Sequence, residues 1–285
     1  MITASLVLYK TPRLQIESLL ASVLPSCVEK LIVVDNSPDD RWRELESRSE
    51  KIRYIHNENL GYGGSHNLAM RLAIEMDADY HVVLNPDIRF EPSVLATLEE
   101  FMNGNPGAVY VLPKVVYPNG DLQYLCKLLP SPSDLIFRRF VPSIGFLKRW
   151  KERRDARYCL VDSGYDRTMN PPCLSGCFMF MRISALKEIG QAGEFFDNRF
   201  FMYFEDFDLI RRLHRVGKTM YFPDVKIIHD HAAESYKSRK MLMAHIKSAF
   251  RYFNKWGWIF DKERKAWNKK ILEELGEVHS MPQNI

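Results

Sequence analysis

The sequence predicts an α/β fold built on a Rossmann-like, doubly wound and mostly parallel sheet. Two apolar runs, "KLIVVD" (30–35) and "YHVVL" (80–84), are rich in β-branched residues, as strands buried on both faces are. Helical patterns alternate with such runs over the first hundred residues, which is typical of right-handed parallel crossovers. In these sheets ligands bind beyond the carboxyl ends of the strands, so the residues that follow each strand are candidates for function.

The remaining elements are predicted from apolar periodicity and from turn residues. A helix begins at Thr11-Pro12, because proline suits the first helical position, and a second helix has Ser65 as its N-cap. The predicted strands are 2–9, 30–35, 51–56, 80–84, 109–112, one within 173–182 and one ending at His229, and the predicted helices are 11–24, 40–50, 66–76, 92–103 and 205–216. Residues 117–124 form a tight turn, and 130–170 is an insertion without clear periodicity.

Composition excludes several classes of protein. A hydrophobic fraction of 46% and a charged fraction of 27% are those of a globular chain, and a net charge of +4 is too small for a dedicated nucleic-acid binder. The start "MITASLVLYK" lacks the basic region of a signal peptide, and no run reaches the roughly 18 apolar residues of a membrane span. We therefore expect a cytoplasmic protein with free thiols at its five scattered cysteines.

Two segments, 137–158 and 237–270, mix arginine and lysine with aromatic residues. Such segments are either solvated helix faces or elements that lie on an anionic membrane surface. The sequence leaves both interpretations open.

Polar residues follow the predicted strands at three places. In "VLNPDIRF", Asn85 and Asp87 flank a proline turn, and they either bind a divalent cation or cap the next helix. In "NENLGYGGSHN" (57–67), the glycines either let backbone amides approach an anionic ligand or form a flexible loop. Asp35 ends the strand 30–35, where it either accepts hydrogen bonds from a nucleotide or caps a helix.

The stretch "FFMYFEDFDL" (200–209) places three carboxylates among aromatic rings at a predicted helix start. We expect Asp208 to be structural, because Arg211 and Arg212 follow it at helical spacing. Asp206 is either a helix cap or a carboxylate whose pKa the aromatic rings raise for general-base catalysis. Further on, His229 and His231 share one face of a strand, where one of them is a candidate metal ligand.

Taken in order, these motifs resemble family 2 glycosyltransferases of the GT-A fold, and in particular their rhamnosyltransferase-like bacterial branch. The blocks "VVDNSPDD", "NENLGYGGSHN", "LNPDI", "LSGCFMFMR", "FFMYFEDFDLIRR" and "IIHDHAAES" carry the resemblance, which runs over about 2–236. It implies a GT-A domain at 1–236, with a nucleotide-binding half (1–115) and an acceptor-side half (116–236), and a C-terminal helical extension at 237–285.

The resemblance also implies roles for single residues. Asn85 stands at the first position of the family's Asp-x-Asp metal motif, which leaves Asp87 as the principal carboxylate ligand of Mg²⁺ or Mn²⁺, with His229 as a further ligand. Asp206 would be the catalytic base of an inverting transfer, and Glu205 would support the helix start or the acceptor. The implied substrate-binding residues are Tyr9, Asp35 and Asn36 around the nucleoside, and Gly61, Gly64 and Asn67 near the sugar diphosphate.

The implied donor is dTDP-rhamnose or a UDP-hexose, and the implied acceptor is a saccharide or a polyprenyl-linked saccharide used for bacterial surface polysaccharide. A lipid-linked acceptor would place the protein at the inner face of the cytoplasmic membrane. Two other functions remain open: a nucleotidyltransferase, although "YKTPRL" (9–14) lacks the glycines of a phosphate loop, and a non-catalytic protein that binds nucleotide sugars.

Overall fold

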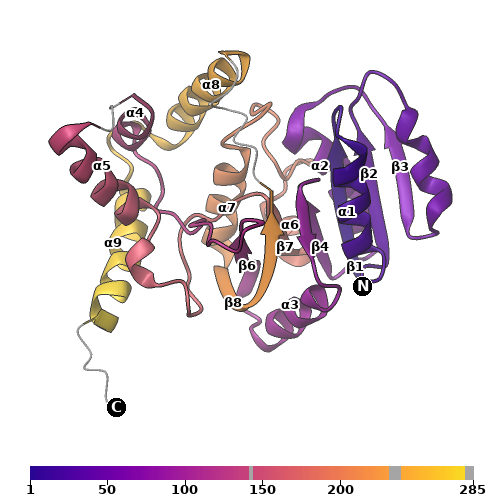
Figure 1. Cartoon of the computed structure of the whole chain (residues 1–285), viewed down its shortest axis with the longest axis horizontal. Helices are drawn as coiled ribbons and strands as arrows, with labels where there is room; N and C mark the ends of the chain where they lie inside the picture. The colour runs from indigo at the N-terminus through magenta and orange to yellow at the C-terminus, as the bar shows by residue number, and fades with distance from the viewer. Residues whose placement is uncertain (141–143, 231–238, 280–285) are drawn as a thin grey trace.

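The computed structural model describes residues 1–140, 144–230 and 239–279. Within these residues the strands form one eight-stranded sheet, in the order β3-β2-β1-β4-β7-β6-β8-β5 (Figure 1). The strands are β1 (Ile2–Leu8), β2 (Lys30–Asp35), β3 (Ile52–His56), β4 (Tyr80–Leu84), β5 (Ile88–Phe90), β6 (Ala108–Val116), β7 (Phe178–Arg182) and β8 (Lys218–His229). β1 to β4 pair in parallel, as do β6 and β8, whereas β7 and β5 run antiparallel to their neighbours. The predicted mostly parallel α/β sheet is confirmed.

The helices agree with the sequence prediction except at three places and at the start of α1, where Pro12 is the N-cap and not the first helical residue. They are α1 (Arg13–Val23), α2 (Gly61–Glu75), α3 (Ser93–Gly104), α4 (Pro132–Phe140), α5 (Gly145–Tyr158), α6 (Ile183–Ile189), α7 (Glu205–Val216), α8 (Arg239–Trp256) and α9 (Lys262–His279), with 3-10 segments η1 (Arg41–Arg48) and η2 (Val161–Ser163). The prediction of Ser65 as an N-cap is wrong, because α2 already begins at Gly61. The predicted helix near 40–50 is the 3-10 segment η1, and the insertion at 130–170 contains α4 and α5.

Both faces of the first half of the sheet are covered by helices. Ile32 and Val34 of β2 pack with Ala69 of α2 on one face. Leu31 and Val33 alternate onto the other face, where they belong to the main core together with residues of α1. Because neither face of β2 meets water, its sequence is apolar without interruption.

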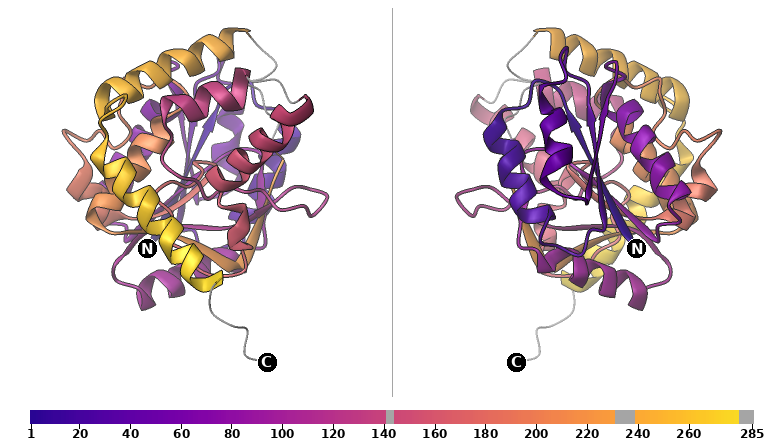
Figure 2. Two further views of the ribbon diagram at one scale, coloured as in Figure 1. Left: turned by 90° about the vertical axis from the view of Figure 1, so that its left-hand side faces the viewer. Right: turned by 90° about the vertical axis from the view of Figure 1, so that its right-hand side faces the viewer.

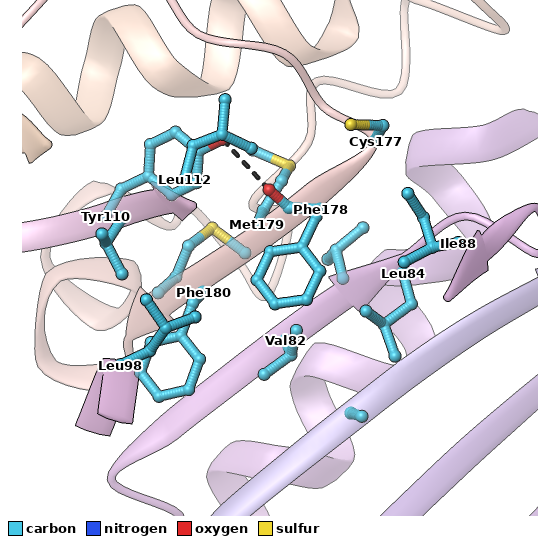
Figure 3. Close-up of a cluster of buried hydrophobic side chains, with 14 of the residues drawn as sticks. Val82, Leu84, Ile88, Leu98, Tyr110, Leu112, Cys177, Phe178, Met179 and Phe180 are labelled. Carbon is cyan, nitrogen blue, oxygen red and sulfur yellow. Dashed lines mark hydrogen bonds between the residues drawn. The ribbon is translucent and has the colours of Figure 1, made fainter. Parts of the chain in front are cut away.

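The neighbouring strands β4 and β6 hold the start of β7 in place. Phe178 and Phe180 of β7 lie opposite Leu84 and Val82 of β4, and both phenylalanines are fully buried (Figure 3). The hydroxyl group of Tyr110 in β6 donates to the backbone oxygen of Phe178 at 3.2 Å, and it lies 2.8 Å from that of Ser175. These contacts hold the loop that precedes β7 against the sheet.

The C-terminal helices are attached to α7 by a buried carboxylate. Asp208 has no exposed surface, and its oxygens accept from Arg212 Nε (2.9 Å), Trp256 Nε1 (2.8 Å) and Lys255 Nζ (2.6 Å). The predicted structural pairing of Asp208 with a following arginine is therefore confirmed for Arg212. Two of the three partners belong to α8, so one carboxylate joins two helices that are distant in the sequence.

Arg211 makes a second connection. Its guanidinium group, 1% exposed, donates to both oxygens of Asp261 at 2.8 and 2.6 Å and to Glu263 at 2.8 Å. It also lies 4.1 Å from the centre of the Trp256 ring. A planar guanidinium fork suits this combination of a bidentate pair and a stacked ring. Helix α7 is thus held by α8, by α9 and by the connection between them.

The rest of the C-terminal segment packs on the same body. Tyr252 and Phe253 of α8 form a buried cluster with Phe200 and Phe204, and Ile271 of α9 joins the main core. Helices α4, α5 and α9 lie at the end of the molecule opposite β3 (Figures 1 and 2). No helix in the described ranges is both long and apolar enough to cross a bilayer. The expected boundary at 236 falls at 231–238, outside the described residues, as does His231.

Replacing Asp208 by alanine tests how strongly the C-terminal helices are held. We expect the free energy of unfolding to fall by about 3–5 kcal/mol, because the change removes the buried carboxylate that Arg212, Lys255 and Trp256 share. Denaturant unfolding measures this. Asp39, whose pair with Arg41 is exposed, provides the matched control: Asp39→Ala should cost less than about 1 kcal/mol. Equal, small losses for both variants would show that the buried carboxylate is not a main attachment.

Candidate active site

Strand β2 ends at buried polar residues. Asp35 is fully buried, and it accepts hydrogen bonds from the hydroxyl group of Tyr54 (2.8 Å) and the backbone nitrogen of Ser37 (2.9 Å). Burial and the nearby Asp35 raise the pKa of Tyr54, so this phenol remains a donor. Asn36 and Ser65 exchange hydrogen bonds at 2.7 and 3.0 Å, while Tyr9, half exposed, follows β1.

A cleft of about 240 Å³ opens beside these strand ends. Its walls come from the segments after β1 and β2, and its lining residues are Lys10, Thr11, Ser37, Pro38, Asp39, Arg41 and Trp42. Lys10 has a positive φ of 53°, and its backbone nitrogen donates to Ser37 Oγ at 2.9 Å. The cleft therefore lies next to the residues that were predicted to bind the nucleoside.

The glycines of 57–67 lie close to other parts of the protein, and Gly61 lies against backbone. Gly61 has a φ of 78°, and a Cβ atom there would lie 2.1 Å from the backbone oxygen of Phe201, so only glycine fits. The side chain of Asn67 donates to Phe196 O (2.8 Å) and accepts from the backbone nitrogens of Phe195 and Phe196. The start of α2 is thus packed against the segment that leads to α7. A role in binding the sugar diphosphate remains a prediction for Gly61, Gly64 and Asn67.

Tyr62 lies where the parts of the site meet, and the sequence analysis missed it. Its hydroxyl group lies 3.0 Å from Asn85 Oδ1 and 2.9 Å from the backbone oxygen of Gly176. Burial, the largest cause, raises its pKa well above the usual range, so the phenol stays protonated. A tyrosine between two glycines at a helix start was the only signal in the sequence.

The structure brings together the two predicted metal ligands, which are distant in the sequence. Strands β5 and β8 pair Ile88 with His229, and the backbone nitrogen of Asp230 donates to Asp87 O at 3.0 Å. As a result, Asp87 Oδ1 lies 3.5 Å from His229 Nε2. Asp87 Oδ1 is buried and accepts no hydrogen bond from the described residues. Within those residues, no group of three histidines, cysteines or acids gathers as a metal site.

Asp206 is held at the first turn of α7 by two backbone amides. Its Oδ2 accepts from Gly176 N at 3.1 Å, and its Oδ1 accepts from Phe207 N at 2.8 Å. A Cβ atom on Gly176 would lie 2.7 Å from Asp206 Cβ, so this approach also requires glycine. Tyr203 and Phe204, just before the helix, have φ values of 69° and 66°, a strained conformation for non-glycine residues.

The two neighbouring carboxyl groups have different environments. Burial and the charge of Asp206 raise the pKa of Glu205 well above its usual range, and its Oε2 is buried with no hydrogen bond among the described residues. Burial also raises the pKa of Asp206, but Lys127 and the amides of Phe207 and Gly176 oppose this rise. Ionisation is therefore less favourable at Glu205 than at Asp206.

Lys127 was not predicted as part of the site. The chain bends back after β6, where Lys127 N donates to Cys173 O at 2.8 Å and Lys127 Nζ lies 5.7 Å from the centre of the Phe207 ring. No motif marks this lysine in the sequence, since its position depends on a contact between distant loops. Gln123, which contacts His229, was missed for the same reason.

Replacing Glu205 by glutamine tests its protonation. The folded state retains a proton that the unfolded chain releases above about pH 4.3, so Glu205 lowers stability as the pH rises. Glutamine has no such proton, so Glu205→Gln should become more stable than the parent protein between pH 5 and pH 8 in denaturant unfolding.

Glu17 is the matched control for this experiment, because a hydrogen bond from Arg48 lowers its pKa. Glu17→Gln should therefore be slightly less stable than the parent at pH 8. A loss of stability in Glu205→Gln at pH 8 would mean that Glu205 is ionised.

Known proteins that are similar to this chain are glycosyltransferases. Residues 13–190 match the family model described as glycosyl transferase family 2. The chain is 30% identical over 231 residues to rhamnosyltransferase WbbL of Escherichia coli K12, covering 78% of this chain and 81% of that protein. It is 27% identical over 238 residues to N-acetylglucosaminyl-diphospho-decaprenol L-rhamnosyltransferase of Mycobacterium tuberculosis, covering 78% and 73%.

A solved structure supports the fold. The crystal structure of TarS from S. aureus aligns with a TM-score of 0.55 at 16% identity, over 99% of this chain and 44% of that one. At this low sequence identity, the structural similarity supports the fold alone. The family model and the identity to WbbL go further, and the chain therefore belongs to glycosyl transferase family 2.

Proposed function

We propose that this glycosyltransferase is inverting and metal-dependent, and that it moves rhamnose or a hexose from a nucleotide sugar to a saccharide or lipid-linked saccharide. The observation that carries the proposal is the adjacent pair of carboxyl groups at the start of α7. Burial raises the pKa of both, and the amides of Gly176 and Phe207, together with Lys127, favour the ionised form of Asp206. Two acidic groups whose environments separate their pKa values are typical of acid–base chemistry.

Asp206 is proposed as the general base. Each of its oxygens accepts one backbone hydrogen bond, which fixes the carboxylate and leaves lone pairs for an acceptor hydroxyl group. The raised pKa of Glu205 disfavours a second negative charge beside Asp206, and Lys127 favours the ionised form of Asp206. Removal of the hydroxyl proton while the oxygen attacks the anomeric carbon gives inversion without a covalent intermediate.

Asp87 and His229 are proposed to hold Mg²⁺ or Mn²⁺. The fit rests on Asp87 Oδ1, a buried carboxylate oxygen without a hydrogen bond from the described residues, which faces an imidazole nitrogen. When bound, the cation supplies positive charge against the departing nucleoside diphosphate. Asn85, held by Tyr62, lies at the same turn.

The donor is proposed to bind beyond β1 and β2, with Tyr9, Asp35 and Asn36 near the nucleoside. The names of the two relatives favour a rhamnose donor, with dTDP-rhamnose first and UDP-hexoses second. A thermal-shift screen of nucleotide sugars with Mn²⁺ identifies the donor, because a bound ligand raises the melting temperature by mass action.

The acceptor is proposed to be lipid-linked, because one relative is named for a diphospho-decaprenol acceptor. Exposed apolar side chains support contact with a membrane surface: Ile136, Ile144, Trp150, Met243, Phe250, Trp258, Ile259 and Phe260. Phe260 is 88% exposed. Exposed cations accompany them, namely Lys148, Arg149 and Lys247. This combination suits peripheral binding at the inner face of the membrane.

Asp206→Asn tests the base. We expect transfer to fall by about 10²–10⁴-fold, because asparagine cannot take the proton. Affinity for the nucleoside diphosphate with Mn²⁺, measured by calorimetry, should stay close to that of the parent. Turnover within about tenfold of the parent would remove Asp206 from the base role, because a base contributes more than that.

Vesicle flotation tests membrane contact. The protein should float with phosphatidylglycerol vesicles at low salt and sink with phosphatidylcholine vesicles. Replacing Trp258, Ile259 and Phe260 together by serine should reduce flotation. Leu14→Ser, at a position 77% exposed on α1, should leave it unchanged. A parent protein that stays at the bottom with anionic vesicles would contradict the membrane proposal.

A further inference from the structure

We propose that Gln123 is a positioning residue that presents His229 to the divalent cation, an inference that rests on the metal site of the proposed function. Gln123 is 4% exposed and follows the turn after β6, where its backbone nitrogen donates to Val115 O at 2.9 Å. Both ends of its amide contact one residue. Nε2 donates to the backbone oxygen of His229 at 2.7 Å, and Oε1 lies 2.9 Å from His229 Nδ1.

These two contacts determine which nitrogen of His229 carries the proton. A backbone carbonyl oxygen can only accept, so the NH₂ end of Gln123 must face it. The other end, Oε1, can also only accept, so His229 Nδ1 must be the donor. In the neutral ring the lone pair is then on Nε2, the nitrogen that faces Asp87.

His229 Nε2, which carries the lone pair, lies 3.5 Å from Asp87 Oδ1. This separation is longer than that of a typical direct hydrogen bond. Both atoms are electron-rich when the ring is neutral, and a cation is the partner that suits both. The backbones of the two residues are already fixed by the pairing of β5 with β8. The backbone does not determine the orientation and the tautomer of the His229 ring, and Gln123 sets both. A hydrogen bond to the ring nitrogen that does not bind the metal orients metal-ligating histidines in the same way.

Gln123→Leu tests this role, because leucine occupies similar space and makes neither hydrogen bond. Asn268→Leu is the matched control. The amide of Asn268 makes the same kind of double contact with backbone, donating to Leu129 O at 2.9 Å and accepting from Leu129 N at 2.8 Å. The contacts of Asn268 are with the backbone of Leu129 and not with His229, so its loss reports only the structural cost of removing such an amide.

The measurement is the affinity of each full-length variant for Mn²⁺ alone, followed by the loss of the free-ion paramagnetic resonance signal. Gln123→Leu should bind Mn²⁺ about 10–100-fold more weakly than the parent protein. Asn268→Leu should bind it as the parent does. In EDTA, both variants should lower the melting temperature by similar amounts, which separates positioning from folding.

Asp87→Ala separates this inference from the proposed function. If Asp87→Ala loses Mn²⁺ binding and Gln123→Leu keeps the parent affinity, the positioning role is overturned and the metal site stands. If Asp87→Ala also keeps the parent affinity, or the parent binds no Mn²⁺, the metal site of the proposed function is itself overturned.

Discussion

The buried carboxylate of Asp208 is the contact on which the placement of the candidate base depends. It lies one turn from the start of α7, two residues after Asp206, and it binds a lysine and a tryptophan of α8 as well as an arginine of its own helix. An unpaired charge at a fully buried position is strongly unfavourable, so the three partners have to remain together. The C-terminal helices are consequently part of the framework of the site.

Close backbone approaches complete that framework. Gly61 lets the carbonyl of Phe201 reach the start of α2, and Gly176 lets the loop before β7 reach Asp206. Arg212, which binds Asp208, also donates to the carbonyl of Phe195 in the segment that Asn67 holds. Helix α2, the loop before β7 and helix α7 are thereby fixed relative to one another. The strained φ values of Tyr203 and Phe204 are tolerated because the surrounding segments are fixed.

The sequence predicted the elements whose local pattern and tertiary role agree. The strands 30–35 and 80–84 are apolar because they are buried, and α7 has acids at its start and an apolar stripe along one side. The short strand β5 was not predicted, because three residues at a sheet edge carry almost no periodicity. The start of α2 was placed too late, because glycines weaken a helical pattern and only the packing against Phe201 explains them.

In the candidate site, too, some residues could be predicted from local motifs and others only from tertiary contacts. Asp87, His229, Glu205 and Asp206 stand in recognisable motifs, so they could be proposed from the sequence. Tyr62, Gln123 and Lys127 take part through contacts between segments separated by 20 or more residues, and no local pattern marks them. A chain read alone indicates which groups carry chemistry, whereas the groups that orient them and adjust their pKa values depend on the three-dimensional structure.

The proposed role of Asp206 as the base implies a single displacement at the anomeric carbon. Such a displacement is visible in the configuration of the product. Once the donor is known, the one-bond carbon–proton coupling at the anomeric carbon can be compared between the donor and the first-formed product by NMR. A single displacement gives opposite anomeric configurations in the two. A product with the configuration of the donor would require two displacements or a different mechanism, and it would contradict the assignment of Asp206 as the base.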